Sequence, residues 1–222
     1  MNPVINRTTL LNSYLLERKE SSYLEIGVRN GENYFAIDAH RKFGVDPNYL
    51  FAKRALMRSW LRRNNWTQKM FRCTSDYFFL KHANRICSKQ KFDLIFVDGM
   101  HTYEQSLMDA INGLRFLKPD GIIVFHDCNP WSKESAEPTI PFGKVSWNGD
   151  VWKTICHFRR HSDFFECFTY EADEGLGVLK LREGVSDLTA PEIAPLSTIK
   201  NMSFDDLQKN RDEYLGLRKL EL

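Results

Sequence analysis

"FDLIFVDGMHTYEQ", residues 92–105, places a continuous apolar run directly before an aspartate, a glycine and a histidine. An apolar run of this length indicates a strand that is buried on both faces of a sheet. Thr102 and Gln105 have the spacing of a capping box, which predicts that a helix begins beside His101. An apolar stripe at helical spacing continues to Leu117. The stretch therefore predicts a buried strand, a short polar turn and a helix.

The same alternation extends in both directions along the chain. The predicted strands are 22–27, 42–46, 69–75, 92–98 and 121–127, with a final pair inside 164–181 joined around Asp173 and Glu174. The predicted helices are a short one within 30–40, then 48–63, 76–87, 102–117 ended by the turn 118–121, 150–161, and a terminal amphipathic helix within 203–222. Strands that alternate with helices predict an α/β fold with a mostly parallel sheet and helices on both faces. The last strand pair has a tight connection and is expected to be antiparallel.

The length of 222 residues, 42% of them hydrophobic, suits one domain with appendages. We expect a domain over 1–181 that begins with a helical segment at 1–20. Residues 182–222 are expected to form a loop and a helix that could cover the site as a lid or join subunits of a homo-oligomer.

Charge and cysteine content narrow the function classes. Lys and Arg number 31 against 29 Asp and Glu, which gives a net charge of +2 and no reason to expect nucleic acid. The five cysteines are scattered and form no metal-binding spacing, so they are predicted to be free thiols in a reducing compartment. Neither a signal peptide nor the run of about 20 apolar residues that a membrane span needs is recognisable. We therefore expect a soluble, cytoplasmic protein.

Polar side chains gather where the predicted strands end. In open α/β sheets, ligands bind outside the carboxyl ends of the strands. One acidic residue at such an end often only caps a turn, but five polar strand ends together favour a ligand site. The residues concerned are Glu25 to Gly31, Asp46, Ser75 and Asp76, Asp98 to His101, and His126 to Asn129.

The first of these ends, "LEIGVRNG" at 24–31, has the form E-x-G-x-x-x-G. It lacks the second close glycine of the G-x-G-x-x-G fingerprint, which admits a pyrophosphate. An adenosine ligand without phosphate is therefore better suited. Asp46 is placed to accept hydrogen bonds from two ribose hydroxyls, and Asp76 could receive an adenine amino group.

These motifs, together with "WNGDVWK" at 147–153, resemble the class I S-adenosylmethionine-dependent methyltransferases of the branch found in surface-polysaccharide and natural-product gene clusters. The resemblance covers residues 22–180. It implies a Rossmann-like, seven-stranded, mostly parallel sheet with an antiparallel last strand. It also implies that S-adenosylmethionine is held by Glu25, Gly27, Asn30, Gly31, Asp46, Ser75 and Asp76.

Asp98 and Asp127 end two strands that are neighbours in such a sheet, so their carboxylates are expected to converge where the methyl group would point. A divalent metal, magnesium, manganese or iron, held by Asp98, Asp127 and His126 could orient and polarise an acceptor hydroxyl. Neutral His101 could act with Asp98 as the catalytic pair and take the hydroxyl proton. The arrangement resembles the metal-dependent macrolide-sugar O-methyltransferases, which carry glutamate where this chain has His126. Either the metal is softer than magnesium, or Asn129 or water replaces His126, or no metal binds.

The loop that follows residue 129 is long, which is typical of a lid or a binding surface. Trp131, Trp147 and Lys144 offer aromatic faces and positive charge for an acceptor, which we expect to be a saccharide or a small natural product with a hydroxyl group. Methylation of nitrogen or carbon stays open. The competing hypotheses are a non-catalytic S-adenosylmethionine-binding module, which would not need the catalytic residues, and a nicotinamide-dependent oxidoreductase, which would need the pyrophosphate fingerprint.

Overall fold

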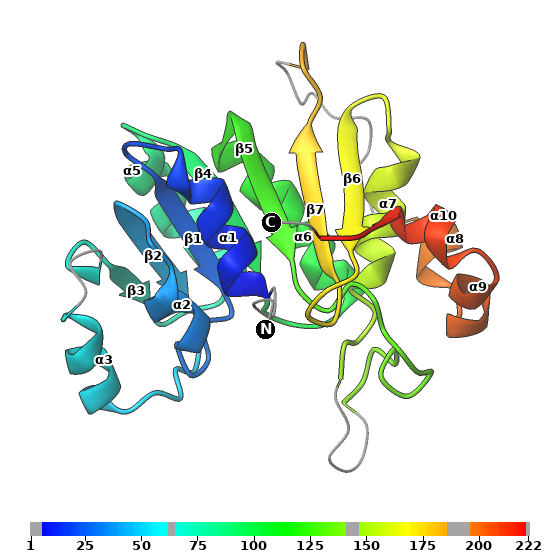
Figure 1. Ribbon diagram of the computed structural model, residues 1–222, viewed down its shortest axis with the longest axis horizontal. Coiled ribbons are helices and arrows are strands. Elements are labelled where there is room, and N and C mark those ends of the chain that lie inside the picture. Colours follow the sequence, from blue (N-terminus) through cyan, green and yellow to red (C-terminus); the bar gives the residue numbers. More distant parts are fainter. Residues whose placement is uncertain (1–5, 62–64, 141–146, 186–195, 221–222) are drawn as a thin grey trace.

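The computed structural model describes residues 6–61, 65–140, 147–185 and 196–220 as a twisted sheet with helices on both faces (Figure 1). The strand order is β3-β2-β1-β4-β5-β7-β6-β8. The strands are β1 (Ser22–Ile26), β2 (Arg41–Val45), β3 (Lys69–Phe71), β4 (Phe92–Val97), β5 (Leu117–Phe125), β6 (Phe165–Tyr170), β7 (Leu176–Leu181) and β8 (Leu217–Arg218).

The strands from β1 to β5 are parallel to their neighbours, and β7 runs antiparallel to both β5 and β6. The predicted α/β sheet with an antiparallel strand near its end is therefore confirmed. The sheet has one strand more than the seven predicted, because β8 pairs with the edge of β6. A strand of two residues is too short to produce a periodic pattern, so β8 could not be predicted from the sequence.

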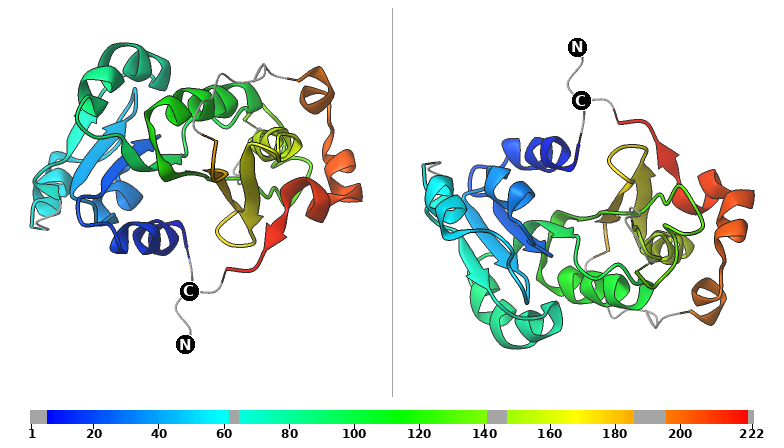
Figure 2. Two further views of the ribbon diagram at one scale, coloured as in Figure 1. Left: turned by 90° about the horizontal axis from the view of Figure 1, so that it is seen from above. Right: turned by 90° about the horizontal axis from the view of Figure 1, so that it is seen from below.

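Alternate side chains of each central strand enter two separate cores. Ile95 and Val97 of β4 face one core, while Leu94 and Phe96 face the other. The helices α1 (Arg7–Leu16) and α2 (Glu32–Ala36) cover one face of the sheet (Figure 2). The opposite face carries α4 (Ser75–Phe78), the π-helical turn η2 (Phe79–Ala83), α5 (Asn84–Cys87), α6 (Tyr103–Phe116) and α7 (Trp152–Arg160). Burial on both sides explains the continuous apolar run of β4.

The start of α6 agrees with the prediction in position and differs from it in one contact. The Thr102 side chain accepts a hydrogen bond from the backbone N–H of Gln105 at 3.4 Å. In a capping box, the Gln105 side chain would also accept a hydrogen bond from the backbone N–H of Thr102. Instead, the Gln105 amide donates to Asp109 Oδ1 at 3.1 Å and to Ser75 Oγ at 3.3 Å. Gln105 therefore ties α6 to the start of α4 rather than closing its own cap.

Four predicted boundaries were wrong. The strand expected over 69–75 ends at Phe71, and Ser75 is already the first residue of α4. The helix expected over 48–63 is limited to α3 (Lys53–Ser59). The expected turn at 118–121 belongs to β5, where it bulges between the pairs Phe92↔Leu117 and Leu94↔Ile122. The single helix expected within 203–222 is divided into α9 (Phe204–Lys209) and α10 (Arg211–Leu215), with Gly216 in a left-handed conformation leading into β8, and a separate short helix, α8 (Ser197–Lys200), precedes it. Pairing of β8 with β6 overrides the helical pattern there.

The C-terminal segment 196–220 lies beside α7 and β6, at the end of the sheet remote from β3 (Figure 1). Arg159 of α7 donates to the backbone oxygen of Glu213 at 3.0 Å, which fixes α10 against α7. A role of this segment as a lid or a subunit contact stays a prediction.

The five cysteines are free thiols, as predicted. In the ranges that the structure describes, no helix has the length and apolar character needed to cross a membrane.

Candidate active site

The ends of β1 and β4 meet at the carboxyl edge of the sheet. Gly27 follows β1 with a φ of 88°, and a Cβ atom there would lie 2.0 Å from the backbone oxygen of Asp98. Only glycine admits this approach, because any other side chain would collide with the next loop. The glycine of the E-x-G motif therefore lets the loops after β1 and β4 lie in contact.

A cavity of about 390 Å³ opens between these loops and the start of α1. Its volume falls in the range of small-molecule pockets. Three of the predicted cofactor residues line it, namely Glu25, Gly27 and Asn30, together with Asp98. Arg7 and Asp173, which the sequence analysis did not select, complete its polar wall.

Glu25 lies at the buried end of this cavity. Its carboxylate accepts hydrogen bonds from the Tyr23 hydroxyl and, at 2.8 Å, from the Asn33 side-chain amide. Burial raises the pKa of Glu25 to about 8, against the opposing effect of these donors. The carboxyl group is therefore held in one orientation by two neighbours that lie on its own strand and on α2.

The other predicted cofactor residues lie outside the lining of this cavity. Gly31 begins α2, and Asp46 follows β2 and accepts hydrogen bonds from the backbone N–H groups of Arg29 at 2.7 Å and Asn48 at 2.6 Å. Asp46 thereby adjoins the loop after β1. Ser75 and Asp76 lie at the start of α4, within reach of the Gln105 amide.

Asp98, His101 and Asp127 come together as the sequence predicted for the ends of adjacent strands. One ligand atom from each lies within 4.8 Å of the others. His101 Nε2 is 3.6 Å from Asp98 Oδ1, and His101 Nδ1 is 3.2 Å from Asp127 Oδ2. Two carboxylates and an imidazole are a donor set that divalent manganese or iron accepts, so these residues fit a metal ion.

His126 lies against this group rather than within it. Its Nδ1 is 2.9 Å from Asp127 Oδ2 and 3.4 Å from Asp98 Oδ1, and its Nε2 is 3.6 Å from Asp173 Oδ1. Burial opposes protonation of the ring, but the three carboxylates outweigh it and raise the pKa of His126 to about 11. In this arrangement the neighbouring carboxylates favour the protonated form of His126, and its service as a metal ligand stays a prediction.

A short segment, 147–150, fixes His101 from the other side. The backbone oxygen of Trp147 lies 2.9 Å from His101 Nδ1, and the two rings are stacked. Asp150 accepts a hydrogen bond from the backbone N–H of Tyr103 at 2.7 Å. Burial lowers the pKa of His101, but contact with Asp98 and the charge of Asp127 prevail and raise it above its ordinary value.

Sequence reasoning missed the residues that hold the carboxylates. Arg7 donates to Asp98 Oδ2 at 3.0 Å and to both carboxylate oxygens of Asp173, at 2.8 and 2.9 Å. Asn148 donates to Asp127 Oδ1 at 2.8 Å. Burial opposes ionisation of Asp98 and Asp173, but the nearby histidines and Arg7 keep the pKa of each carboxyl well below its ordinary value. The predicted hairpin around Asp173 was the one available signal, since an antiparallel β7 must begin at the carboxyl edge.

The predicted acceptor residues have separate locations. Trp147 contacts His101 through one face, and its indole N–H donates to the backbone oxygen of Glu137 at 2.7 Å. Trp131 is 61% exposed. Lys144 lies outside the described residues.

Comparisons with known proteins agree with this fold. A family described as "Methyltransferase domain" matches residues 22–128. The O-methyltransferase TomG from Streptomyces achromogenes, solved in complex with SAM, is similar over 78% of each chain, with 16% identity and a TM-score of 0.55. The SAH-bound methyltransferase PaMTH1 from Podospora anserina is similar over 79% of this chain and 78% of its own, with 17% identity and a TM-score of 0.50.

Cofactor-bound Rv0187 from MTB is similar over 82% of this chain and 84% of its own, with 12% identity and a TM-score of 0.59. No protein of curated function matches the sequence significantly. The structural relatives share the fold, and the family match covers the strands and loops from β1 to the end of β5. Residues 22–128 therefore match a methyltransferase domain, and the chain as a whole shares its fold with methyltransferases solved with SAM or SAH bound.

Proposed function

We propose that the protein is an O-methyltransferase that moves the methyl group of S-adenosylmethionine to a hydroxyl group of a saccharide or a small natural product. Asp98, His101 and Asp127 converge beside the cavity of about 390 Å³ that Gly27 lines. This convergence is the observation that carries the proposal. A base next to the donor pocket is what a hydroxyl acceptor requires, because a neutral hydroxyl is a weak nucleophile.

The cavity suits the methionine end of the donor. Arg7 supplies a cationic fork that matches a carboxylate, Asp98 and Asp173 supply negative charge for an ammonium group and a sulfonium, and Glu25 supplies hydrogen-bonding oxygens at the buried end. The ribose and adenine are proposed to extend past Asp46 towards Ser75 and Asp76. Asn30 and Gly31 would border the donor through the loop before α2.

His101 is proposed to act as the base through its Nε2 atom. The backbone oxygen of Trp147 can only accept, so the 2.9 Å contact requires the proton on Nδ1 and leaves the Nε2 lone pair free in the neutral ring. As the acceptor oxygen bonds to the methyl carbon, the carbon–sulfur bond breaks, and the hydroxyl proton passes to Nε2. The products are the methyl ether and S-adenosylhomocysteine, with His101 carrying the proton until it returns to solvent.

Metal assistance is part of the proposal through Asp98 and Asp127, with His126 in its neutral form as the third ligand, so that the Nε2 lone pair of His101 stays available for the hydroxyl proton. A divalent cation held there would supply Lewis-acid polarisation of the acceptor hydroxyl. The residues of the chain would keep their tasks of orienting the acceptor and excluding water. Trp131, Trp147 and Lys144 are proposed to contact the acceptor.

Calorimetric titration tests the donor first, with S-adenosylmethionine and S-adenosylhomocysteine added separately, each with and without manganese or magnesium. We expect both nucleosides to bind. Release of S-adenosylhomocysteine is then measured with mono- and oligosaccharide acceptors, and mass spectrometry locates the methyl group. Failure of either nucleoside to bind would remove the proposal, and a methyl group found on nitrogen or carbon would contradict its hydroxyl chemistry.

Matched variants separate binding from chemistry. Asp98→Asn and His101→Ala are expected to lower kcat by at least a hundredfold while donor affinity changes little. His40→Ala, which removes an exposed histidine at the opposite edge of the sheet, serves as the control. Loss of donor binding in both site variants would contradict the division of roles.

A further inference from the structure

A second cavity bounded by the described residues lies at the amino edge of the sheet, opposite the candidate active site. Its volume is about 1490 Å³. Lys69 and Arg41 begin β3 and β2, and Asp93 and Lys118 are the second residues of β4 and β5, so four strand starts contribute to its wall. The five residues of β1 separate the two edges by about 15 Å at the usual strand rise. This cavity is therefore distinct from the proposed donor pocket.

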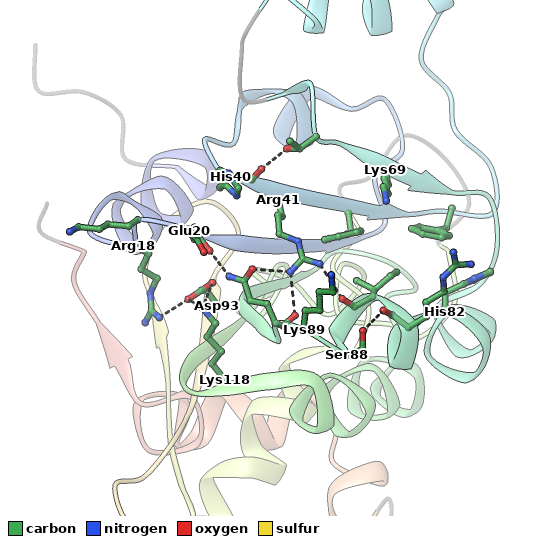
Figure 3. Close-up of a pocket in the computed structure, with 17 residues that line it drawn as sticks. Arg18, Glu20, His40, Arg41, Lys69, His82, Ser88, Lys89, Asp93 and Lys118 are labelled. Carbon is green, nitrogen blue, oxygen red and sulfur yellow. Dashed lines mark hydrogen bonds and ion pairs between the residues drawn. The ribbon is translucent and has the colours of Figure 1, made fainter.

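The lining of the cavity is strongly basic although the whole chain is nearly neutral. Seven lysines and arginines and two histidines line it, against two carboxylates. The cations are Arg18, Lys19, Arg41, Lys69, Arg85, Lys89 and Lys118. Figure 3 shows Arg18 and Lys118 at one end, His82 and Lys69 at the other, and Arg41 between them. The positive charge is thus spread along the cavity rather than concentrated at one point.

One of the two carboxylates is already neutralised. Asp93 is 2% exposed and forms ion pairs with Arg18 and Lys118, both at 2.8 Å. It also accepts the backbone N–H of Ser22 at 2.8 Å. Arg18 also pairs with the exposed Asp120 at 2.9 Å, so the two cations at this end are balanced by two carboxylates, and the uncompensated positive charge lies further along the cavity.

The central cation is held in place without being neutralised. Arg41 donates to the side-chain oxygen of Gln90 at 2.9 Å and to the backbone oxygen of Ile86 at 3.1 Å. These partners are uncharged, so the guanidinium keeps its full charge in a fixed orientation. Among the residues that the structure describes, Lys69, Arg85 and Lys89 have no carboxylate within ion-pair distance.

The far wall is aromatic and lies partly on a π-helical turn. His82 belongs to η2, and its ring centroid is 4.9 Å from that of Phe71. Single π-helical turns are rare and are frequently found at functional sites. The half-buried rings of Phe71 and His82 offer a surface on which a planar group can stack.

We propose that this cavity binds an oligophosphate, a ligand with at least two linked phosphate groups. Separate cations along one concave surface match a chain of phosphates, and guanidinium and ammonium groups are their usual partners. Inorganic polyphosphate and nucleoside polyphosphates share this chemistry, and the aromatic wall favours the nucleoside form. The gathering of the cationic groups along one concave surface favours a small ligand over a nucleic-acid polymer.

Calorimetry with inorganic tripolyphosphate and ATP at constant ionic strength tests the proposal, with adenosine as the uncharged comparison. Tripolyphosphate has no adenosine and therefore does not probe the donor pocket. We expect both phosphates to bind and adenosine not to bind this cavity. Tighter binding of ATP than of tripolyphosphate would identify the nucleoside form, and equal binding would identify the inorganic chain.

The chain offers a matched pair of charge reversals. Arg85→Glu with Lys89→Glu changes two exposed cations that line the cavity, and Lys81→Glu with Lys91→Glu changes two exposed cations of the same segment that do not. We expect the first pair to weaken tripolyphosphate binding at least tenfold and the second by less than threefold. Equal losses in both variants would show general charge attraction and would overturn the site.

Chemical acetylation of the wild-type protein provides a second measurement that needs no variant. Tripolyphosphate is expected to protect Lys69 and Lys89 from acetylation, read by mass spectrometry, and to leave Lys81 and Lys91 reactive. Absence of both binding and protection at millimolar tripolyphosphate and ATP would refute the proposal. Binding of a single-stranded oligonucleotide alone would assign the surface to nucleic acid and would equally refute it.

Discussion

The indole ring of Trp147 lies nearly parallel to the imidazole ring of His101, with centroids 4.9 Å apart and planes inclined by 17°. The backbone oxygen of the same residue lies 2.9 Å from His101 Nδ1. One residue of the loop after β5 therefore sets both the plane and the tautomer of the proposed base. Trp147 is also predicted to bind the acceptor, and its contact with His101 adds a positioning task.

Trp147→Ala is expected to lower kcat roughly tenfold or more, because His101 loses the ring that fixes its plane while the backbone contact remains. Trp147→Phe should restore most of the rate, since a phenyl ring can also stack. Steady-state kinetics measure both variants. Trp131→Ala is the comparison and should change the KM for the acceptor instead. An unchanged kcat in Trp147→Ala would show that the stacking has no part in turnover.

Gly149→Ala should destabilise the protein by more than about 2 kcal/mol. Gly149 has a φ of 64°, and a Cβ atom there would lie 1.8 Å from the backbone oxygen of His101. Gly184→Ala is the matched control, because Gly184 has a φ of 85° but no atom within 4 Å of its added Cβ. Gly184→Ala should lower the free energy of unfolding by only about 1 kcal/mol. Urea denaturation measures the free energy of unfolding of both variants. Equal losses would show that the positive φ alone, and not the contact with His101, makes alanine unfavourable at position 149.

Arg7→Ala should weaken S-adenosylmethionine binding by roughly tenfold and lower the free energy of unfolding by about 2 kcal/mol, because Asp98 and Asp173 lose a charged donor. Arg7→Lys should recover only part of both, since an ammonium group cannot form the paired bonds to Asp173. Calorimetry and urea denaturation give the two values. Arg160→Ala, an exposed arginine at the end of α7, serves as the control. Full recovery of donor affinity and stability in Arg7→Lys would show that the paired hydrogen bonds of the Arg7 guanidinium to Asp173 are not needed.

Asp109 should make stability depend on pH. Burial raises the pKa of this carboxyl to about 7 in the folded protein, from an ordinary value of 3.8. Between these values the folded state binds more protons than the unfolded state, so the free energy of unfolding should fall as pH rises from about 4 to 7, by roughly 1.4 kcal/mol per unit of pKa difference.

Asp109→Asn should flatten this part of the pH profile and leave the protein more stable than the wild type above pH 7. Urea denaturation at several pH values from 4 to 8 provides the measurement. Asp205→Asn, which changes an exposed carboxylate, should leave the slope as it is. A wild-type slope that persists in Asp109→Asn would assign the pH dependence to other groups.

Hydrophobic patterning predicted most of the sheet. The run Phe92–Val97 and the shorter runs around it have the length and burial that parallel strands require, and the structure confirms their order of alternation. The pattern failed where pairing partners decide the conformation. Leu217 and Arg218 become a strand only because the edge of β6 lies beside them.

The candidate site likewise has residues that could be predicted from the sequence and residues that could not. Asp98, His101 and Asp127 were predictable because each follows a buried strand and parallel strands end at one edge of a sheet. Arg7, Asn148 and the contact of Asp173 with Arg7 were not, because no periodic pattern records which loops face each other.

The sequence by itself determined the family of folds, the strand ends that carry polar side chains, and the chemistry that those side chains can perform. Only the tertiary structure decided that Arg7 reaches Asp98 across 91 residues of chain, and that Trp147 covers His101. The physical reason is that the pattern of buried and exposed side chains along a strand or helix depends on residues that are close together in the sequence. The partner of a charge or a ring depends instead on which distant segments the packed sheet brings into contact.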